Sequence, residues 1–228
     1  MLGVSLASLK AFAQSQNTPI YQYIASHYNN GSYSMPITMM NILNGGSHAD
    51  NNVDIQEFMI YPSGLNSFSD AIQCGCEIFY KLKEVLKAKN YNTAVGDEGG
   101  FAPNLRSNQE ALDLLSDSVL KSGYNLGTDI FFTLDVAASE IFNKQDGLYH
   151  LSSERKKLTN EEIIALYQNL CNQYPIYSIE DGLDENDWGG WAKLNDTLGA
   201  KIQLVGDDLT VTNIKKLNKA IDMKAINA

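Results

Sequence analysis

Strands and helices alternate through the second half of this sequence, and an acidic residue follows each of three strands. The nearly continuous apolar run at 130–134 predicts a strand covered on both faces, and similar short runs lie at 176–179 and 201–205. Helices are predicted between and after these strands. One begins at the capping pair Thr159 and Glu162, and two others span 188–198 and 211–221. This order predicts right-handed crossovers and a parallel sheet, and therefore an α/β fold.

The first half of the sequence is less regular. Apolar periodicity and turn residues predict helices at 4–14, 20–27 and 68–88, and a further helix that starts at a Ser107–Glu110 capping box and runs to about 121. Short apolar runs predict strands at 35–43 and 56–61, and a last strand begins at 224–228. No Pro- or Ser-rich linker divides the chain.

Composition and charge limit the classes of function that this chain can have. The chain has 17 Lys and Arg against 27 Asp and Glu, a net charge of −10, which argues against nucleic acid or an anionic membrane as a main partner. No apolar run approaches the roughly 20 residues of a membrane span, and no basic residue precedes the apolar start at 2–9, so we expect no signal peptide. Three cysteines suit a reduced, intracellular protein in which they only pack.

The acidic residues after the strands are Asp135, Glu180 and Asp207. The carboxyl ends of parallel strands are where α/β enzymes build their active sites, so these three carboxylates are expected in one small space. Their repulsion requires a cation or raised pKa values, and all-oxygen ligands favour Mg²⁺ over Mn²⁺ or Ca²⁺. The alternative is that each acid only caps the following helix.

Two other segments carry candidate residues. The loop 96–100 (GDEGG) holds Glu98 between glycines, which suits an acid that must approach a substrate closely, although an acidic surface turn has the same composition. The loop 44–50 (NGGSHAD) places His48 after a predicted strand, where a histidine on its own is usually a surface residue.

Several segments closely resemble the enolase family, the glycolytic phosphopyruvate hydratases, and especially its bacterial branch. They are LGVSLA at 2–7, MNILNGGSHADNNVDIQEFM at 40–59, NTAVGDEGGFAPN at 92–104, SIEDGLDENDW at 178–188 and VGDDLTVTN at 205–213. The resemblance runs from residue 2 to residue 228.

The resemblance implies an incomplete enolase-type TIM-like barrel with the first five strands and the start of the sixth. It implies that residues 1–34 are the C-terminal remnant of an α+β N-terminal domain, including its last helices, and that 35–228 are a truncated C-terminal barrel domain. The strands at 35–43 and 56–61 would be the first two of the barrel.

The resemblance also implies roles. Asp135, Glu180 and Asp207 match the family's ligands for a tightly held Mg²⁺. Glu98 matches the acid that protonates the departing hydroxyl, with Glu57 beside it, and His48 and Gln56 match residues of the substrate pocket. The implied reaction is the reversible dehydration of 2-phosphoglycerate to phosphoenolpyruvate with two Mg²⁺ ions. A cytoplasmic homodimer or higher oligomer is implied, with a secondary cell-surface or secreted pool.

In the family pattern the general base is a lysine on the sixth barrel strand, which would follow 224–228. We therefore expect the 228 residues alone to fold poorly and not to catalyse. Two alternatives remain open: another Mg²⁺-dependent acid lyase or racemase of the enolase superfamily, and a non-catalytic surface-binding role.

Overall fold

The computed structural model describes residues 2–28 and 31–228; residues 1, 29 and 30, within the predicted N-terminal segment, lie outside the described residues. The chain forms two units, Met1–Pro36 and Ile37–Ala228. The described part of the first unit contains helices α1 (Leu2–Ser15) and α2 (Ile20–Tyr28), as predicted. The division falls close to the predicted boundary between 34 and 35, and the assignment of these units as domains of a longer protein stays a prediction.

A five-stranded sheet organises the second unit. Its strands are β1 (Met40–Asn44), β2 (Glu57–Tyr61), β3 (Phe131–Asp135), β7 (Ile176–Glu180) and β8 (Gln203–Val205), in the order β1-β2-β3-β7-β8. The strands β3, β7 and β8 are parallel, as the alternation of strands and helices predicts. Both pairings of β2 are antiparallel, a reversal that the sequence pattern does not reveal.

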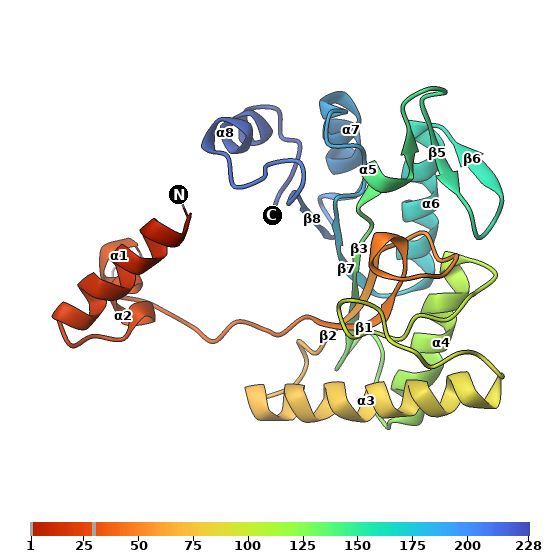
Figure 1. Ribbon diagram of the computed structural model, residues 1–228, viewed down its shortest axis with the longest axis horizontal. Helices are drawn as coiled ribbons and strands as arrows, with labels where there is room; N and C mark the ends of the chain where they lie inside the picture. Colours follow the sequence, from red (N-terminus) through yellow and green to blue (C-terminus); the bar gives the residue numbers. More distant parts are fainter. Residues whose placement is uncertain (1, 29–30) are drawn as a thin grey trace. The chain divides into compact units, whose positions relative to one another are not determined.

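Four helices lie along one side of this sheet: α3 (Phe68–Ala88), α4 (Asn108–Lys121), α6 (Asn160–Gln173) and α7 (Trp188–Leu198) (Figure 1). Every second strand residue belongs to one hydrophobic core with the helices, among them Phe58, Ile60, Phe132, Leu134, Ile179 and Leu204. Because side chains alternate along a strand, the residues between them face the other side of the sheet. That opposite face carries the acidic residues.

Helix starts follow the capping signals, with one difference. Thr159 and Glu162 form the reciprocal capping box at α6. At α4, Ser107 accepts a hydrogen bond from the Glu110 N–H, but the Glu110 carboxylate does not return to the Ser107 N–H. It instead accepts hydrogen bonds from the backbone and guanidinium of Arg106 and from the Tyr91 hydroxyl, because a cation and a phenol offer it stronger donors.

The structure contains a second, three-stranded sheet that the sequence pattern did not predict. It consists of β4 (Phe142–Asn143), β5 (Leu148–Leu151) and β6 (Lys156–Leu158), and follows the short helix α5 (Ala138–Ile141). These strands are too short to show a clear period of two. They lie in the connection between β3 and α6, and therefore beside the carboxyl end of β3.

Three predicted boundaries are wrong. The strand predicted at 35–43 begins only at Met40, because Pro36 lacks an N–H and the residues before Met40 are mostly exposed. The helix predicted at 211–221 is α8 (Ile214–Asp222), since Val211 and Thr212 have positive φ angles. The segment 224–228 is not a strand, although the N–H groups of Asn227 and Ala228 donate to the Leu204 carbonyl of β8.

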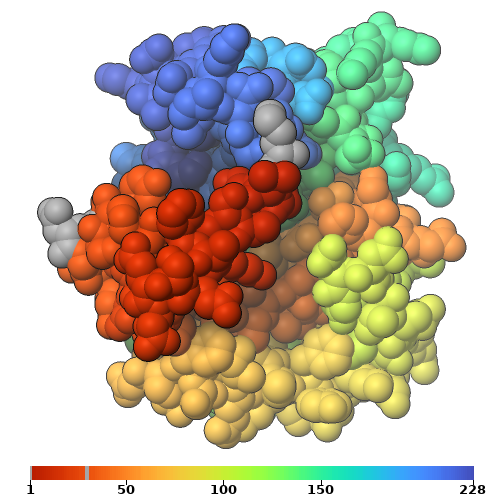
Figure 2. Space-filling model, turned by 60° about the vertical axis from the view of Figure 1, so that its left-hand side comes forward, coloured from red at the N-terminus to blue at the C-terminus, as the bar shows by residue number. Residues whose placement is uncertain are grey.

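Helix α8 lies at the surface of the second unit, where its segment is drawn in blue (Figure 2). Its apolar residues Ile214, Leu217 and Ile221 are exposed. Among the described residues, no helix combines the length and apolar character needed to cross a membrane.

Two glycines give opposite predictions for stability. A Cβ on Gly64 would lie 2.2 Å from the Thr128 carbonyl oxygen, so Gly64→Ala should destabilise the protein by about 1–3 kcal/mol through backbone displacement. A Cβ on Gly189, in α7, meets no atom within 4 Å, so Gly189→Ala should stabilise by up to about 1 kcal/mol through helix propensity. The midpoint of thermal unfolding should fall for the first variant and rise for the second; an equal change in both would contradict the assigned packing.

Candidate metal and acid site

A row of acidic side chains crosses the sheet at one edge. Glu57 pairs with Asp135 between β2 and β3, and Asp135 pairs with Glu180 between β3 and β7. Directly paired residues point to the same face of a sheet, so the three carboxylates are neighbours. Because β2 is antiparallel to β3, its first residue, Glu57, lies at the edge where β3 and β7 end.

The structure places the three predicted metal ligands in two overlapping groups. Carboxylate oxygens of Asp135, Glu180 and Asp181 lie within 4.8 Å of one another, and so do those of Asp181, Asp207 and Asp208. Within the described part of the chain, the predicted set of Asp135, Glu180 and Asp207 does not by itself form such a group. Asp181 belongs to both groups and connects them.

Asp181 is a functional candidate that the sequence reasoning missed. It follows Glu180 directly and has a φ of 44°, which turns the chain at the end of β7. One carboxylate oxygen, Oδ2, accepts a hydrogen bond of 2.9 Å from the Asp208 N–H; the other, Oδ1, is buried and has no hydrogen-bond partner. The two adjacent acids Glu180 and Asp181 were the sequence signal that could have identified it.

Burial and mutual repulsion dominate the electrostatics of this group. Burial, followed by the charges of Asp135, Asp181 and Asp207, raises the pKa of Glu180 to about 8. Burial and the Glu57 charge raise the pKa of Asp135 to about 6, and burial is also the main cause that raises the pKa of Asp181 to about 7. None of the ion pairs among the described residues gives these acids a basic partner.

These residues fit a divalent cation. Oxygen ligands, a buried carboxylate oxygen without a partner and uncompensated negative charge are the features that a hard ion such as Mg²⁺ would satisfy. The Asp135 carboxylate is already oriented by the Gln56 side-chain amide at 3.3 Å and by the Ala137 N–H at 3.1 Å. Gln56, predicted for the substrate pocket, thus contacts a predicted metal ligand.

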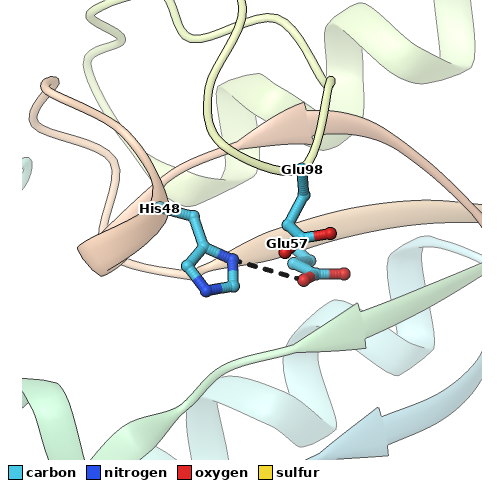
Figure 3. Close-up of side chains that lie close together, drawn as sticks. All are labelled: His48, Glu57 and Glu98. Carbon is cyan, nitrogen blue, oxygen red and sulfur yellow. Dashed lines mark ion pairs between the residues drawn. The ribbon is translucent and has the colours of Figure 1, made fainter.

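A second cluster combines His48, Glu57 and Glu98 (Figure 3). His48 Nδ1 lies 3.3 Å from Glu57 Oε1. Glu98 approaches Glu57 from the loop 96–100, which is separate from the loop that carries His48. Glu57 and His48 are half-buried, whereas Glu98 is exposed. Burial is the main cause that raises the pKa of Glu57; the Glu98 charge adds to it and His48 opposes it. Three predicted site residues therefore meet at one place.

Close backbone contacts hold the two loops of this cluster together. The Asp97 N–H donates to the His48 carbonyl at 2.9 Å, and the Gly100 N–H donates to the Asn44 side chain at 2.8 Å. A Cβ on Gly96 would lie 2.5 Å from the His48 carbonyl oxygen, so this approach requires glycine. The loop 96–100 is thus fixed against the His48 loop, and Glu98 is presented by it.

Carboxylates gathered at the carboxyl ends of parallel strands in an α/β fold are typical of the domains of α/β enzymes, which build their active sites there. The family described as "Enolase, C-terminal TIM barrel domain" matches residues 32–228. The chain therefore belongs to the enolase family, and the sheet is part of its barrel, here not closed among the described residues.

Curated relatives agree with this assignment. The chain is 57% identical to proteins named enolase from two strains of Legionella pneumophila, Lens and Corby, over 229 aligned residues that cover 100% of this chain and 53% of each relative. The chain thus spans about half the length of the curated relatives it matches.

The raised pKa values predict how stability depends on pH and metal. The folded protein binds more protons than the unfolded chain between about pH 4, the usual carboxyl pKa, and about pH 8. Without metal, the free energy of unfolding should therefore fall as pH rises through this window.

Millimolar Mg²⁺ should raise the midpoint of thermal unfolding more at pH 8.5 than at pH 5.5, because protons compete with the ion at low pH. Glu180→Gln should remove most of this difference, whereas Asp196→Asn, on the exposed face of α7, should not. An equal effect of Mg²⁺ at both pH values would contradict the assignment of these acids as its ligands.

Proposed function

We propose that a full-length protein containing this chain is a glycolytic enolase, which reversibly dehydrates 2-phospho-D-glycerate to phosphoenolpyruvate with Mg²⁺. The observation that carries the proposal is the row Glu57, Asp135 and Glu180 at one sheet edge, with Asp181 beside it and Glu98 facing Glu57. Family membership supports the same reaction.

Asp135, Glu180 and Asp207 would hold the metal, with Asp181 close to all three. Two bound Mg²⁺ ions would supply the positive charge that stabilises the dianion built when the proton next to the substrate carboxylate is removed. The uncompensated negative charge at this edge means that the acids would attract the ions first. The same negative charge would repel an anionic substrate unless bound cations offset it.

Glu98 would donate a proton to the departing hydroxyl, since hydroxide is a poor leaving group. Burial, together with the charge of Glu98, raises the pKa of its neighbour Glu57, and two adjacent carboxylates resist joint ionisation. His48 and Gln56 would contact the substrate, His48 from its loop and Gln56 from beside Asp135. We also propose a cytoplasmic homo-oligomer.

Glu98→Gln in the full-length protein should lower kcat for dehydration by a factor of about 10²–10⁴, because the amide cannot donate the required proton. Mg²⁺ binding, measured by calorimetry, should remain, since Glu98 is not among the proposed metal ligands Asp135, Glu180 and Asp207. Asp97→Asn removes the same charge from the same loop and should leave kcat within about twofold. Normal dehydration by Glu98→Gln would show that another group is the acid.

We also propose that the 228 residues alone do not form phosphoenolpyruvate, because the family pattern places the base lysine on the strand that would follow 224–228. An assay with 2-phosphoglycerate and excess Mg²⁺ on the purified chain tests this expectation. Turnover at the rate of an intact enolase would mean that a residue within the chain serves as the base. Turnover of a different acid by the full-length protein would instead favour another member of the superfamily.

A further inference from the structure

Asp54 is a buried carboxylate outside both clusters. It is 4% exposed, and none of the ion pairs among the described residues includes it. A buried charge is costly unless hydrogen bonds replace its lost hydration, so the neighbours of Asp54 have to supply neutral donors.

Those donors come from two distant segments. In the turn between β5 and β6, the Ser152 N–H donates to Asp54 Oδ1 at 2.5 Å and the Ser153 hydroxyl donates to Oδ2 at 2.5 Å. The Ser153 N–H adds a longer bond of 3.4 Å. At the start of α4, the buried Asn108 side-chain amide donates to Oδ2 at 3.0 Å. One carboxylate thus joins the second sheet to a core helix.

The same residue lies on the segment that supports the His48 loop. Asn108 Oδ1 accepts hydrogen bonds from the backbone N–H groups of Asp54 and Ile55, each 3.1 Å. The Gly46 N–H donates to the Val53 carbonyl, and the Gly45 N–H donates to the Gln56 carbonyl. The segment 53–56 is therefore fixed on one side by Asn108 and holds the loop with His48 on the other.

The segment then enters β2, where Gln56 reaches Asp135 and Glu57 reaches His48. A shift of the backbone at Asp54 would move both contacts together, because Asp54, Gln56 and Glu57 lie within four consecutive positions of the chain.

We propose that Asp54 is a positioning residue that sets the geometry of His48, Gln56 and Glu57, and that it does so by anchoring their segment to the β5–β6 turn and to α4. The inference rests on the proposed function only for its effect on catalysis. Its structural part stands independently, because hydrogen exchange reports on the anchoring whether or not the protein is an enolase.

Asp54→Ala in the full-length protein should increase amide hydrogen exchange in two separate segments, 45–57 and 148–158, by about tenfold or more, since local opening requires these hydrogen bonds to break. In the same variant kcat should fall by about 10- to 100-fold, because groups around the reacting centre are misplaced. KM should rise as well, because His48 and Gln56 are proposed to contact the substrate. Asp54→Asn retains the acceptor for Ser152 but faces the Asn108 amide with a second donor, so it should restore part of the lost kcat.

Two further variants complete the experiment. Ser118→Ala removes a buried hydrogen bond within α4, from the Ser118 hydroxyl to the Leu114 carbonyl, and should change neither exchange at 45–57 nor kcat. Ser153→Ala removes only the hydroxyl donor to Asp54 Oδ2 and leaves the backbone bond from the Ser152 N–H in place. It should therefore increase exchange at both segments less than Asp54→Ala does, and it keeps the test available if Asp54→Ala does not fold.

Unchanged exchange at 45–57 in folded Asp54→Ala and in Ser153→Ala would overturn the proposal. So would an equal loss of kcat in Ser118→Ala, because a general loss of stability would then explain the effect. If the parent protein did not dehydrate 2-phosphoglycerate, the proposed function would fail, while the exchange measurements would still decide whether Asp54 anchors the segment.

Discussion

Repulsion between carboxylates at one edge of the sheet is the constraint around which this domain is arranged. The strands β2, β3 and β7 place Glu57, Asp135 and Glu180 side by side, and burial increases the free-energy cost of their charges. No basic side chain among the described residues relieves this cost through an ion pair with Asp135 or Glu180. A fold that keeps such an arrangement loses stability at this edge, and a bound cation, as proposed, would offset that loss.

The surrounding structure holds this unfavourable arrangement in place. On one face of the sheet, apolar strand residues and four helices form the core, which supplies the favourable free energy. At the acidic edge, backbone N–H groups and neutral side chains fix individual carboxylates without neutralising them: Ala137 and Gln56 contact Asp135, and the Asp208 N–H contacts Asp181. Neutral donors thereby set geometry and leave the negative charge available.

The sequence was informative where one local pattern determined the outcome. Apolar runs identified the cores of β2, β3 and β7, and the Thr159–Glu162 pair identified the start of α6. The sequence was uninformative where pairing between distant segments determined the structure. The antiparallel direction of β2, the small sheet from β4 to β6 and the alternative partner of Glu110 all depend on contacts that no local period encodes.

The residues of the candidate site were likewise predicted from the sequence only in part. Strand-end position predicted Asp135 and Glu180 as neighbours, because parallel strands end at a common edge. Asp181 was missed because its contribution depends on a positive φ angle at the end of β7, which aims its side chain toward Asp208. The roles of His48, Gln56 and Glu57 followed only from resemblance, and their placement together follows from the reversal of β2.

That reversal changes which connections can take part in chemistry. In a barrel of parallel strands, the loops that enter the strands lie at the end opposite the site and serve mainly to join the elements. Here β1 and β2 form an antiparallel pair, so the connection 45–56 begins and ends at the acidic edge. One continuous stretch therefore places a glycine turn, His48, Asp54 and Gln56 in the same region. Natural selection can then act on this one short loop as a whole.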